Sequence, residues 1–209
     1  MAALSDFDAD AAACPFVPVL TVDSVETAVP LGRALRDAGL RVLEITLRTE
    51  AGLDAIAAMK DQLDGISIGA GTITTPQQVT AAVEAGSDFL VSPGLTDPLI
   101  AAFDGLDMPI FPGVATPSEA MRALSLGFRR QKLFPAEQVG GRTMLEALGG
   151  PLAQISFMPT GGITATTAGA FLALDNVFAV GGSWMIDKAA LAAGDWDKLR
   201  DYARQKTAL

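Results

Sequence analysis

The chain has 209 residues, half of them apolar, which fits one compact globular domain rather than a disordered or fibrous chain. Fifteen Lys and Arg against 24 Asp and Glu give a net charge of −9, so nucleic acid and acidic membrane surfaces are disfavoured as partners. The sequence contains no histidine, which excludes Ser-His-Asp hydrolases and histidine-ligated metal sites. We therefore expect no metal and no cofactor, and a catalyst made from other side chains.

The N-terminal residues lack the basic and apolar order of a secretory signal, and no apolar run reaches the roughly 18–20 residues of a membrane span. The single cysteine, Cys14, cannot form an intrachain disulfide. These features predict a cytoplasmic protein.

Short apolar runs alternate with longer amphipathic segments along the chain, which is typical of strands alternating with helices. Eight strands are predicted, at residues 17–21, 41–46, 67–70, 89–91, 110–111, 129–133, 155–157 and 177–180. Helices are predicted at residues 6–13, 24–38, 76–85, 117–126 and 196–206, with Ser24, Thr75 and Thr116 as N-caps. This order predicts a (β/α)8 TIM barrel with an extra N-terminal helix, one domain over residues 1–209. An open doubly wound sheet is the alternative.

Lys132 differs from the other lysines because it lies at the carboxyl end of the sixth predicted strand, where barrel enzymes place their chemistry. Strand alternation puts Arg130, Lys132 and Phe134 on one face. If that face is the inner one, burial favours the neutral amine, which attacks carbonyl groups. The other lysines fall in helical or polar segments, where a surface role is expected: Lys60, Lys188, Lys198 and Lys206.

Glu44 lies within the apolar strand at residues 41–46, where a carboxylate is unfavourable unless it is paired or protonated. It is a candidate acid/base for Lys132, and a purely structural Glu44–Lys132 salt bridge is the alternative. Arg48 follows on the next loop, and its guanidinium group is a candidate for bidentate binding of a substrate carboxylate. The hydroxyl of Thr72, after Gly69-Ala70-Gly71, is a second candidate for that carboxylate.

Two double glycines follow the last two predicted strands, Gly161-Gly162 and Gly181-Gly182. Each precedes a segment with a helical pattern. Bare backbone N–H groups and helix N-termini at these positions form the phosphate site common in barrels. An anionic, phosphorylated ligand is therefore predicted to bind locally despite the negative net charge.

In chain order, the segments VPVL, RVLEITLRT, GAGT, SPG, FPG, KLFPAE, PTGGI and VGGSW resemble the 2-keto-3-deoxy-6-phosphogluconate (KDPG) aldolase family. The resemblance spans nearly the whole chain. It implies a class I aldolase on a (β/α)8 barrel, a homotrimer, which cleaves KDPG to pyruvate and glyceraldehyde 3-phosphate late in the Entner–Doudoroff pathway. Cleavage of 4-hydroxy-2-oxoglutarate is a further activity that the family implies.

The same resemblance implies roles for individual residues. Lys132 would form the Schiff base and Glu44 would be the acid/base. The remaining implied positions are a pyruvyl carboxylate pocket of Arg48, Thr72 and Pro93, Phe134 beside the imine, Thr160 and Ser183 as substrate contacts, and Gly161, Gly162, Gly182 and Ser183 at the phosphate.

Relatives that prefer the galactonate epimer resemble this chain but tend to have an apolar residue where Thr160 stands, so Thr160 favours the gluconate substrate. Two other kinds of protein remain as alternatives: another phosphate-binding barrel enzyme, such as an isomerase or a synthase of thiamin or tryptophan biosynthesis, and a non-catalytic sugar-phosphate binding protein.

Overall fold

The computed structural model describes residues 2–208, in which short strands alternate with helices. The strands are β1 (Phe16–Leu20), β2 (Val42–Thr46), β3 (Ser67–Gly71), β4 (Leu90–Val91), β5 (Ile110–Phe111), β6 (Gly113–Val114), β7 (Arg130–Leu133), β8 (Ser156–Pro159) and β9 (Val180–Gly182). The helices are α1 (Ala2–Ala13), α2 (Val25–Asp37), α3 (Gly52–Gln62), α4 (Pro76–Glu84), α5 (Asp97–Phe103), α6 (Pro117–Ser125), α7 (Gly141–Gly149), α8 (Ala168–Leu172), α9 (Lys188–Ala193) and α10 (Trp196–Thr207), with a 3₁₀ turn, η1 (Glu137–Val139). None of the described helices is long and apolar enough to cross a membrane.

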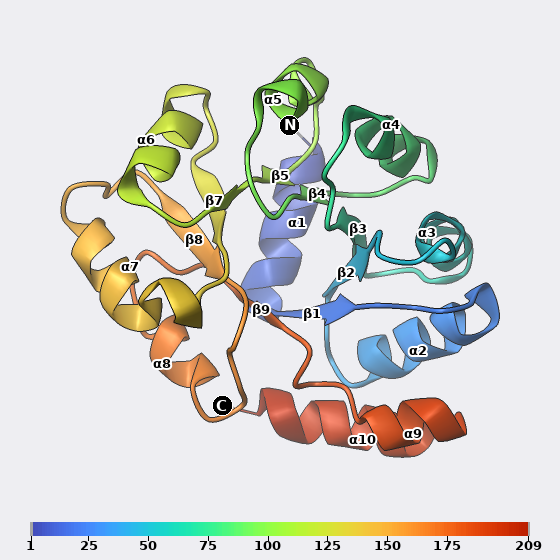
Figure 1. Cartoon of the computed structure of the whole chain (residues 1–209). Helices are drawn as coiled ribbons and strands as arrows, with labels where there is room; N and C mark the ends of the chain where they lie inside the picture. The colour runs from blue at the N-terminus through green and yellow to red at the C-terminus, as the bar shows by residue number, and fades with distance from the viewer. Residues whose placement is uncertain (1, 209) are drawn as a thin grey trace.

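The fold is an α/β fold with a curled parallel sheet, and its helices lie around the outside of the strands (Figure 1). Six strands pair in the order β5-β4-β3-β2-β1-β9, and three more pair as β6-β7-β8. All of these pairs are parallel. Isolated bridges, Phe157 to Val177 and Thr160 to Gly181, link the region of β8 to that of β9.

The fifth predicted strand, residues 110–111, is confirmed as β5, but the interpretation of Pro112-Gly113 as a turn is wrong, because a further strand, β6, begins at Gly113. Pro112 separates β5 from β6, because proline has no N–H to continue the ladder. Its carbonyl instead accepts a hydrogen bond from the Lys132 N–H at 2.9 Å, and Gly113 pairs with Lys132. The described residues therefore form nine strands in two sheets rather than eight in one.

Four of the predicted helices, α2, α4, α6 and α10, are confirmed within one residue at their ends, and two of them have complete caps. In α4 and α6, Thr75 and Thr116 each accept the backbone N–H of the third helical residue, and Gln78 and Glu119 return the bond. Ser24 occupies the N-cap position of α2, but its hydroxyl makes no capping hydrogen bond. The chain leaves α6 through Gly127, whose φ of 94° suits glycine.

Strand alternation separates two layers of apolar side chains. On β2, Leu43 and Ile45 pack in the larger core between the strands and the outer helices. Val42 belongs instead to a smaller inner cluster that includes Phe89 and Phe111. Glu44 lies on the same face of β2 as Val42, so the strand directs its one carboxylate to the inner side.

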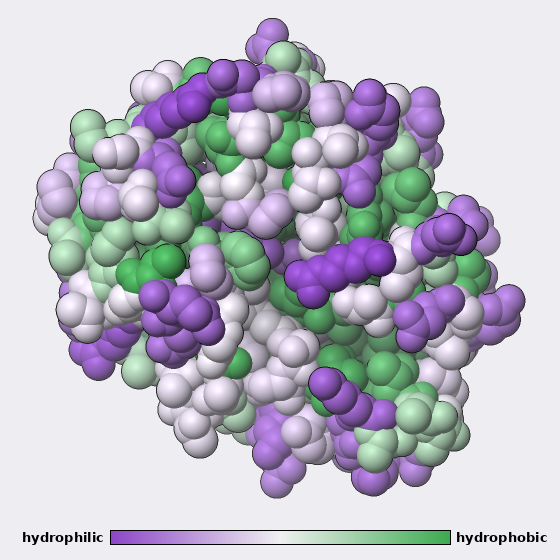
Figure 2. All heavy atoms as spheres, in the orientation of Figure 1, coloured by the Kyte–Doolittle hydropathy of each residue, from purple (hydrophilic) through white to green (hydrophobic). Residues whose placement is uncertain are grey.

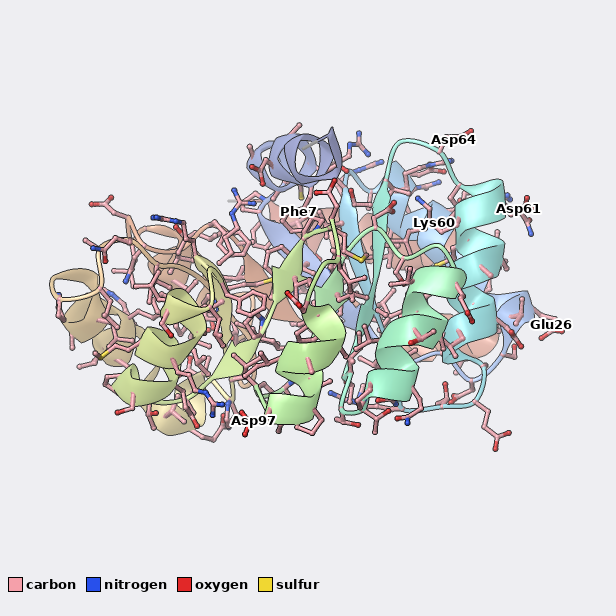
Figure 3. The ribbon with its side chains drawn as sticks, turned by 90° about the horizontal axis from the view of Figure 1, so that it is seen from above. Phe7, Glu26, Lys60, Asp61, Asp64 and Asp97 are labelled. Atoms are coloured by element: carbon pink, nitrogen blue, oxygen red, sulfur yellow. The ribbon has the colours of Figure 1, made fainter. Side chains whose placement is uncertain are left out.

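Helix α1 confirms the extra N-terminal helix predicted at residues 6–13 and begins earlier, at Ala2. It lies across one end of the strands (Figures 1 and 3), and Figure 3 places Phe7 at that end and Asp97 at the opposite one. Phe7 is 1% exposed, with its ring centroid 5.2 Å from Phe89 and 4.8 Å from Phe111. This helix covers the amino ends of the strands and leaves the carboxyl ends for the site.

Candidate active site

Lys132 lies on the inner face of β7. Its neighbour Gln131 points the other way, where its amide donates hydrogen bonds to the carbonyls of Ala120 and Phe128 at 3.0 and 2.9 Å. Arg130, on the same face as Lys132 but nearer the amino end, pairs with Asp8 of α1. The predicted inner face of Arg130, Lys132 and Phe134 agrees with these contacts, and Lys132 is only 5% exposed.

Glu44 and Lys132 meet across the inner side, with Lys132 Nζ 3.2 Å from Glu44 Oε1. The carboxylate is fully buried. Its second oxygen, Oε2, is also buried and has no hydrogen-bond partner among residues 2–208. An unpartnered buried carboxylate oxygen costs folding free energy, about 1–3 kcal/mol or more for a charged group, so its retention favours a chemical role.

Gly71 provides the room for this carboxylate. It pairs with Thr46 on β2, and a Cβ at residue 71 would lie 2.5 Å from Glu44 Cγ and 2.6 Å from Glu44 Cδ, closer than side chains pack. Only glycine at this position lets Glu44 lie against the backbone of β3.

Arg48 and Thr72 lie side by side at the carboxyl ends of β2 and β3, where Arg48 Nε donates a hydrogen bond to Thr72 Oγ1 at 3.1 Å. Thr72 has a φ of 60°, an unfavourable conformation for a β-branched residue that costs of order 1–3 kcal/mol. Backbone strain of this kind is concentrated at functional sites, so Arg48 and Thr72 stay candidates for the predicted carboxylate pocket.

A cavity of about 540 Å³ opens at the carboxyl ends of the strands. Figure 2 shows this face of the molecule, with a hollow near the centre whose bottom is formed by pale and green atoms. Seven of the predicted site residues line it: Arg48, Phe134, Thr160, Gly161, Gly162, Gly182 and Ser183. Residues from four separate strand ends are therefore brought to one space.

The other four predicted site residues do not line the cavity: Lys132, Glu44, Thr72 and Pro93. Lys132 lies beside it, with Nζ 5.3 Å from the centroid of the Phe134 ring. Thr72 is connected to the cavity only by its hydrogen bond with Arg48, which lines it. The Pro93 backbone packs against Gly113, the β6 partner of Lys132, so it borders the lysine rather than the cavity.

The two glycine pairs differ from the prediction in two respects. Gly161 and Gly162 have φ values of 107° and 81° and line the cavity with Gly182. Gly181 and Gly182, however, belong to β9 rather than following it, and the helices α8 and α9 begin only at Ala168 and Lys188. The backbone of a loop and of a strand end, rather than a helix end directly after each glycine pair, faces the cavity.

Lys188 was expected on the surface, and that prediction is incomplete, because Lys188 also lines the cavity. Apolar residues that sequence reasoning did not select line it as well: Val19, Leu20, Leu31, Ile163, Ile186 and Leu191. One sequence signal was available for Lys188, since a lysine at the first position of a helix opposes the helix dipole.

The arrangement combines a buried amine, a buried carboxylate beside it, an arginine fork and exposed backbone at glycine loops. An amine can add to a carbonyl group, a carboxylate can move protons, and the fork and loops can bind anions. Among the described residues no group of three or more His, Cys, Asp or Glu is placed to hold a metal ion.

Comparison with known proteins agrees with this geometry. Residues 8–202 match the family model described as KDPG and KHG aldolase. The KHG/KDPG aldolase of Escherichia coli K12 is 45% identical over 191 residues, which cover 91% of this chain and 90% of that protein.

Two solved structures are similar over nearly their full length. The KDPG aldolase of Legionella pneumophila, crystallised with pyruvate as a covalent carbinolamine, superposes with a TM-score of 0.91 at 38% identity, covering 96% of this chain and 98% of that one. The Zymomonas mobilis enzyme, crystallised with 3-phosphoglycerate, has a TM-score of 0.88 at 38% identity, covering 97% and 95%. The chain belongs to the KDPG and KHG aldolase family.

Proposed function

We propose that the chain is a class I aldolase that reversibly cleaves KDPG to pyruvate and glyceraldehyde 3-phosphate through an imine on Lys132. The observation that carries the proposal is the buried Lys132–Glu44 pair at 3.2 Å, beside a cavity lined by Arg48 and the glycine loops. The covalent pyruvate carbinolamine of the Legionella relative supports the same chemistry.

Lys132 acts first. Its neutral amine attacks the C2 ketone of the substrate and forms a carbinolamine, which loses water to give a protonated imine. The imine nitrogen then accepts the electron pair released when the C3–C4 bond breaks. No metal is needed as the electrophile in this sequence of steps.

Glu44 moves the protons. Glu44 Oε1 is bonded to Lys132, whereas Oε2 has no partner in the described part of the chain and can bind a water or a substrate hydroxyl. Glu44 takes the C4-hydroxyl proton as C3–C4 cleavage releases the aldehyde, and it then protonates the enamine at C3. Water releases pyruvate from the resulting imine.

The remaining predicted residues bind the substrate. Arg48 and Thr72, with Pro93, hold the pyruvyl carboxylate, and Phe134 packs beside the imine. Thr160 and Ser183 contact the sugar chain, and Gly161, Gly162, Gly182 and Ser183 bind the phosphate. The position of most of these residues around one cavity supports the assignment.

A second activity, cleavage of 4-hydroxy-2-oxoglutarate, is favoured by the name of the E. coli relative, a KHG/KDPG aldolase. The reaction needs the same imine and the same proton transfers, because the two substrates share the atoms from C1 to C4.

Thr160, which is 5% exposed and lines the cavity, favours the gluconate-derived epimer. The test is a side-by-side assay of pyruvate release from the gluconate- and galactonate-derived phosphates. We expect the higher kcat/KM with the gluconate compound. Equal values, or a preference for galactonate, would contradict the assignment, and release of pyruvate from neither would contradict the aldolase proposal.

At the level of the whole molecule, we propose a closed (β/α)8 barrel over residues 1–209, in which β5 and β6 together form the fifth strand, supported by the two bridges between the regions of β8 and β9. We also propose a cytoplasmic homotrimer that acts late in the Entner–Doudoroff pathway. Light scattering should then give a mass three times the 21.6 kDa of the chain.

A further inference from the structure

The charged residues that line the cavity are both cations. Arg48 and Lys188 line it and no described carboxylate does, although the chain has 24 acidic residues against 15 basic ones. Arg48 lies beside Thr72, at the end assigned to the substrate carboxylate. Lys188 lines the cavity together with Gly161, Gly162 and Gly182 of the two glycine pairs. Two separate cations fit a substrate with an anionic group at each end.

The ammonium of Lys188 is not neutralised by the protein. Its side chain is exposed and has no ion pair or hydrogen bond within residues 2–208. The adjacent carboxylate, Asp187, is already engaged, since its Oδ1 accepts the N–H groups of Ala189 and Ala190 at 2.9 and 3.1 Å. Its Oδ2 lies 3.5 Å from Lys198 Nζ. Hydrogen bonding from the Ala190 N–H, and the charge of Lys198, hold the pKa of the Asp187 carboxyl below its usual range.

The position of Lys188 is unfavourable for the helix that contains it. It is the first residue of α9, where the helix dipole repels a cation. Leu191, one turn later on the same side of α9, also lines the cavity, so this side of the helix faces the cavity. A cation that opposes the dipole of its own helix departs from a local preference, and such departures are concentrated at functional sites.

From these observations we infer that Lys188 binds the terminal phosphate and sets the preference for phosphorylated over unphosphorylated substrates. The inference rests on the proposed aldolase function and adds to it a residue outside the glycine loops. A flexible ammonium suits this position, because it can follow a phosphate as a point charge from an exposed edge of the cavity.

The test compares KDPG with 2-keto-3-deoxygluconate, which has the same carbon chain without the phosphate. In Lys188→Ala, the kcat/KM for KDPG divided by that for 2-keto-3-deoxygluconate should fall by about 10-fold or more, mainly through a higher KM for KDPG. A loss of this size is expected when a charge-assisted hydrogen bond is removed. Lys188→Arg should recover most of the ratio. Lys206→Ala is the matched control, since it removes the same charge from α10 at a residue that does not line the cavity, and its ratio should stay at the wild-type value.

Pyruvate has no phosphate, so borohydride trapping of pyruvate on Lys132 should be the same in Lys188→Ala as in the wild type. A wild type that cleaves KDPG, with an unchanged ratio in Lys188→Ala, would overturn this inference alone. So would an equal loss with both substrates. A wild type that neither traps pyruvate nor cleaves KDPG would overturn the proposed function and this inference with it.

Discussion

Glu44 has one carboxylate oxygen bonded to Lys132 and one buried without a partner. A structural salt bridge accounts for Oε1, but it leaves Oε2 desolvated without compensation. A proton-transfer role accounts for both, because the free oxygen can reach water or a substrate hydroxyl while the other oxygen keeps the carboxylate beside the amine. The two interpretations differ in what happens when the charge is removed.

Glu44→Gln should lower kcat by roughly 100-fold or more, the contribution of general acid–base catalysis, while part of the imine formation with pyruvate remains. The measurement is steady-state pyruvate release, together with borohydride trapping on the same preparation. Glu84→Gln, the same change at an exposed position on α4, should have no effect. Unchanged turnover in Glu44→Gln would favour the structural salt bridge.

Gly71→Ala should impair catalysis without removing any functional group. The added Cβ would fall 2.5 Å from Glu44 Cγ, so the carboxylate must move away from Lys132. A displacement of about 1 Å in an active site can cost about 100-fold in rate, and we expect kcat to fall by this order. Gly150→Ala is the control, because a Cβ there meets nothing within 4 Å. A Gly71→Ala enzyme with wild-type kcat would show that the close packing is not required.

The sequence was sufficient to select Glu44, a charged residue in an otherwise apolar strand, and Lys132, the one lysine at the carboxyl end of a predicted strand. Lys188 was not selected, because a lysine in a polar helical segment breaks no rule except the dipole preference, which is weak. Its place at the cavity depends on where the chain that follows β9 places α9, which is a tertiary property.

Helix α1 stabilises the strands from their amino ends. Phe7 packs against Phe89 and Phe111, Asp10 accepts a hydrogen bond from Ser67 at 2.6 Å, and Asp8 pairs with Arg130. Arg130 is on the same strand as Lys132, but it contacts Asp8 of α1 and the ring of Phe178 and does not line the cavity. This helix therefore contributes to stability more than to chemistry.

Phe7→Ala should lower the free energy of unfolding by about 3–5 kcal/mol, the usual cost of removing a buried phenyl ring. Urea denaturation measures the loss. KM for KDPG should stay near the wild-type value at low temperature, because Phe7 lies at the end of the strands away from the cavity. Met121→Ala, 57% exposed on α6, should change stability by no more than about 0.5 kcal/mol. A loss below about 1 kcal/mol in Phe7→Ala would contradict the packing of α1.

Structural features that depend on neighbouring residues in the sequence were predictable, whereas features that depend on contacts between distant residues were not. The cap of each helix, α4 or α6, depends on only four consecutive residues, so Thr75 and Thr116 could be selected from the sequence. The extra strand β6 could not be predicted, because it depends on Gly113 and Val114 pairing with β7 across the sheet. Short strands such as β4, only two residues long, also leave little periodicity to detect.

The charges of the whole molecule are distributed unevenly, so that a protein with a net charge of −9 can bind an anionic substrate. The charged residues that line the cavity are Arg48 and Lys188, with no described carboxylate among them. The carboxylate at the site, Glu44, lies behind the lining and is paired with Lys132. The folded chain can therefore attract an anion locally while its outer surface repels polyanions.

Reduction with borohydride in the presence of pyruvate, followed by peptide mass mapping, tests whether Lys132 forms the imine. We expect a pyruvate adduct on Lys132, none on Lys60, Lys188, Lys198 or Lys206, and none in Lys132→Arg. An unmodified Lys132 in the wild-type protein, or an adduct on another lysine that persists in Lys132→Arg, would contradict an imine on Lys132.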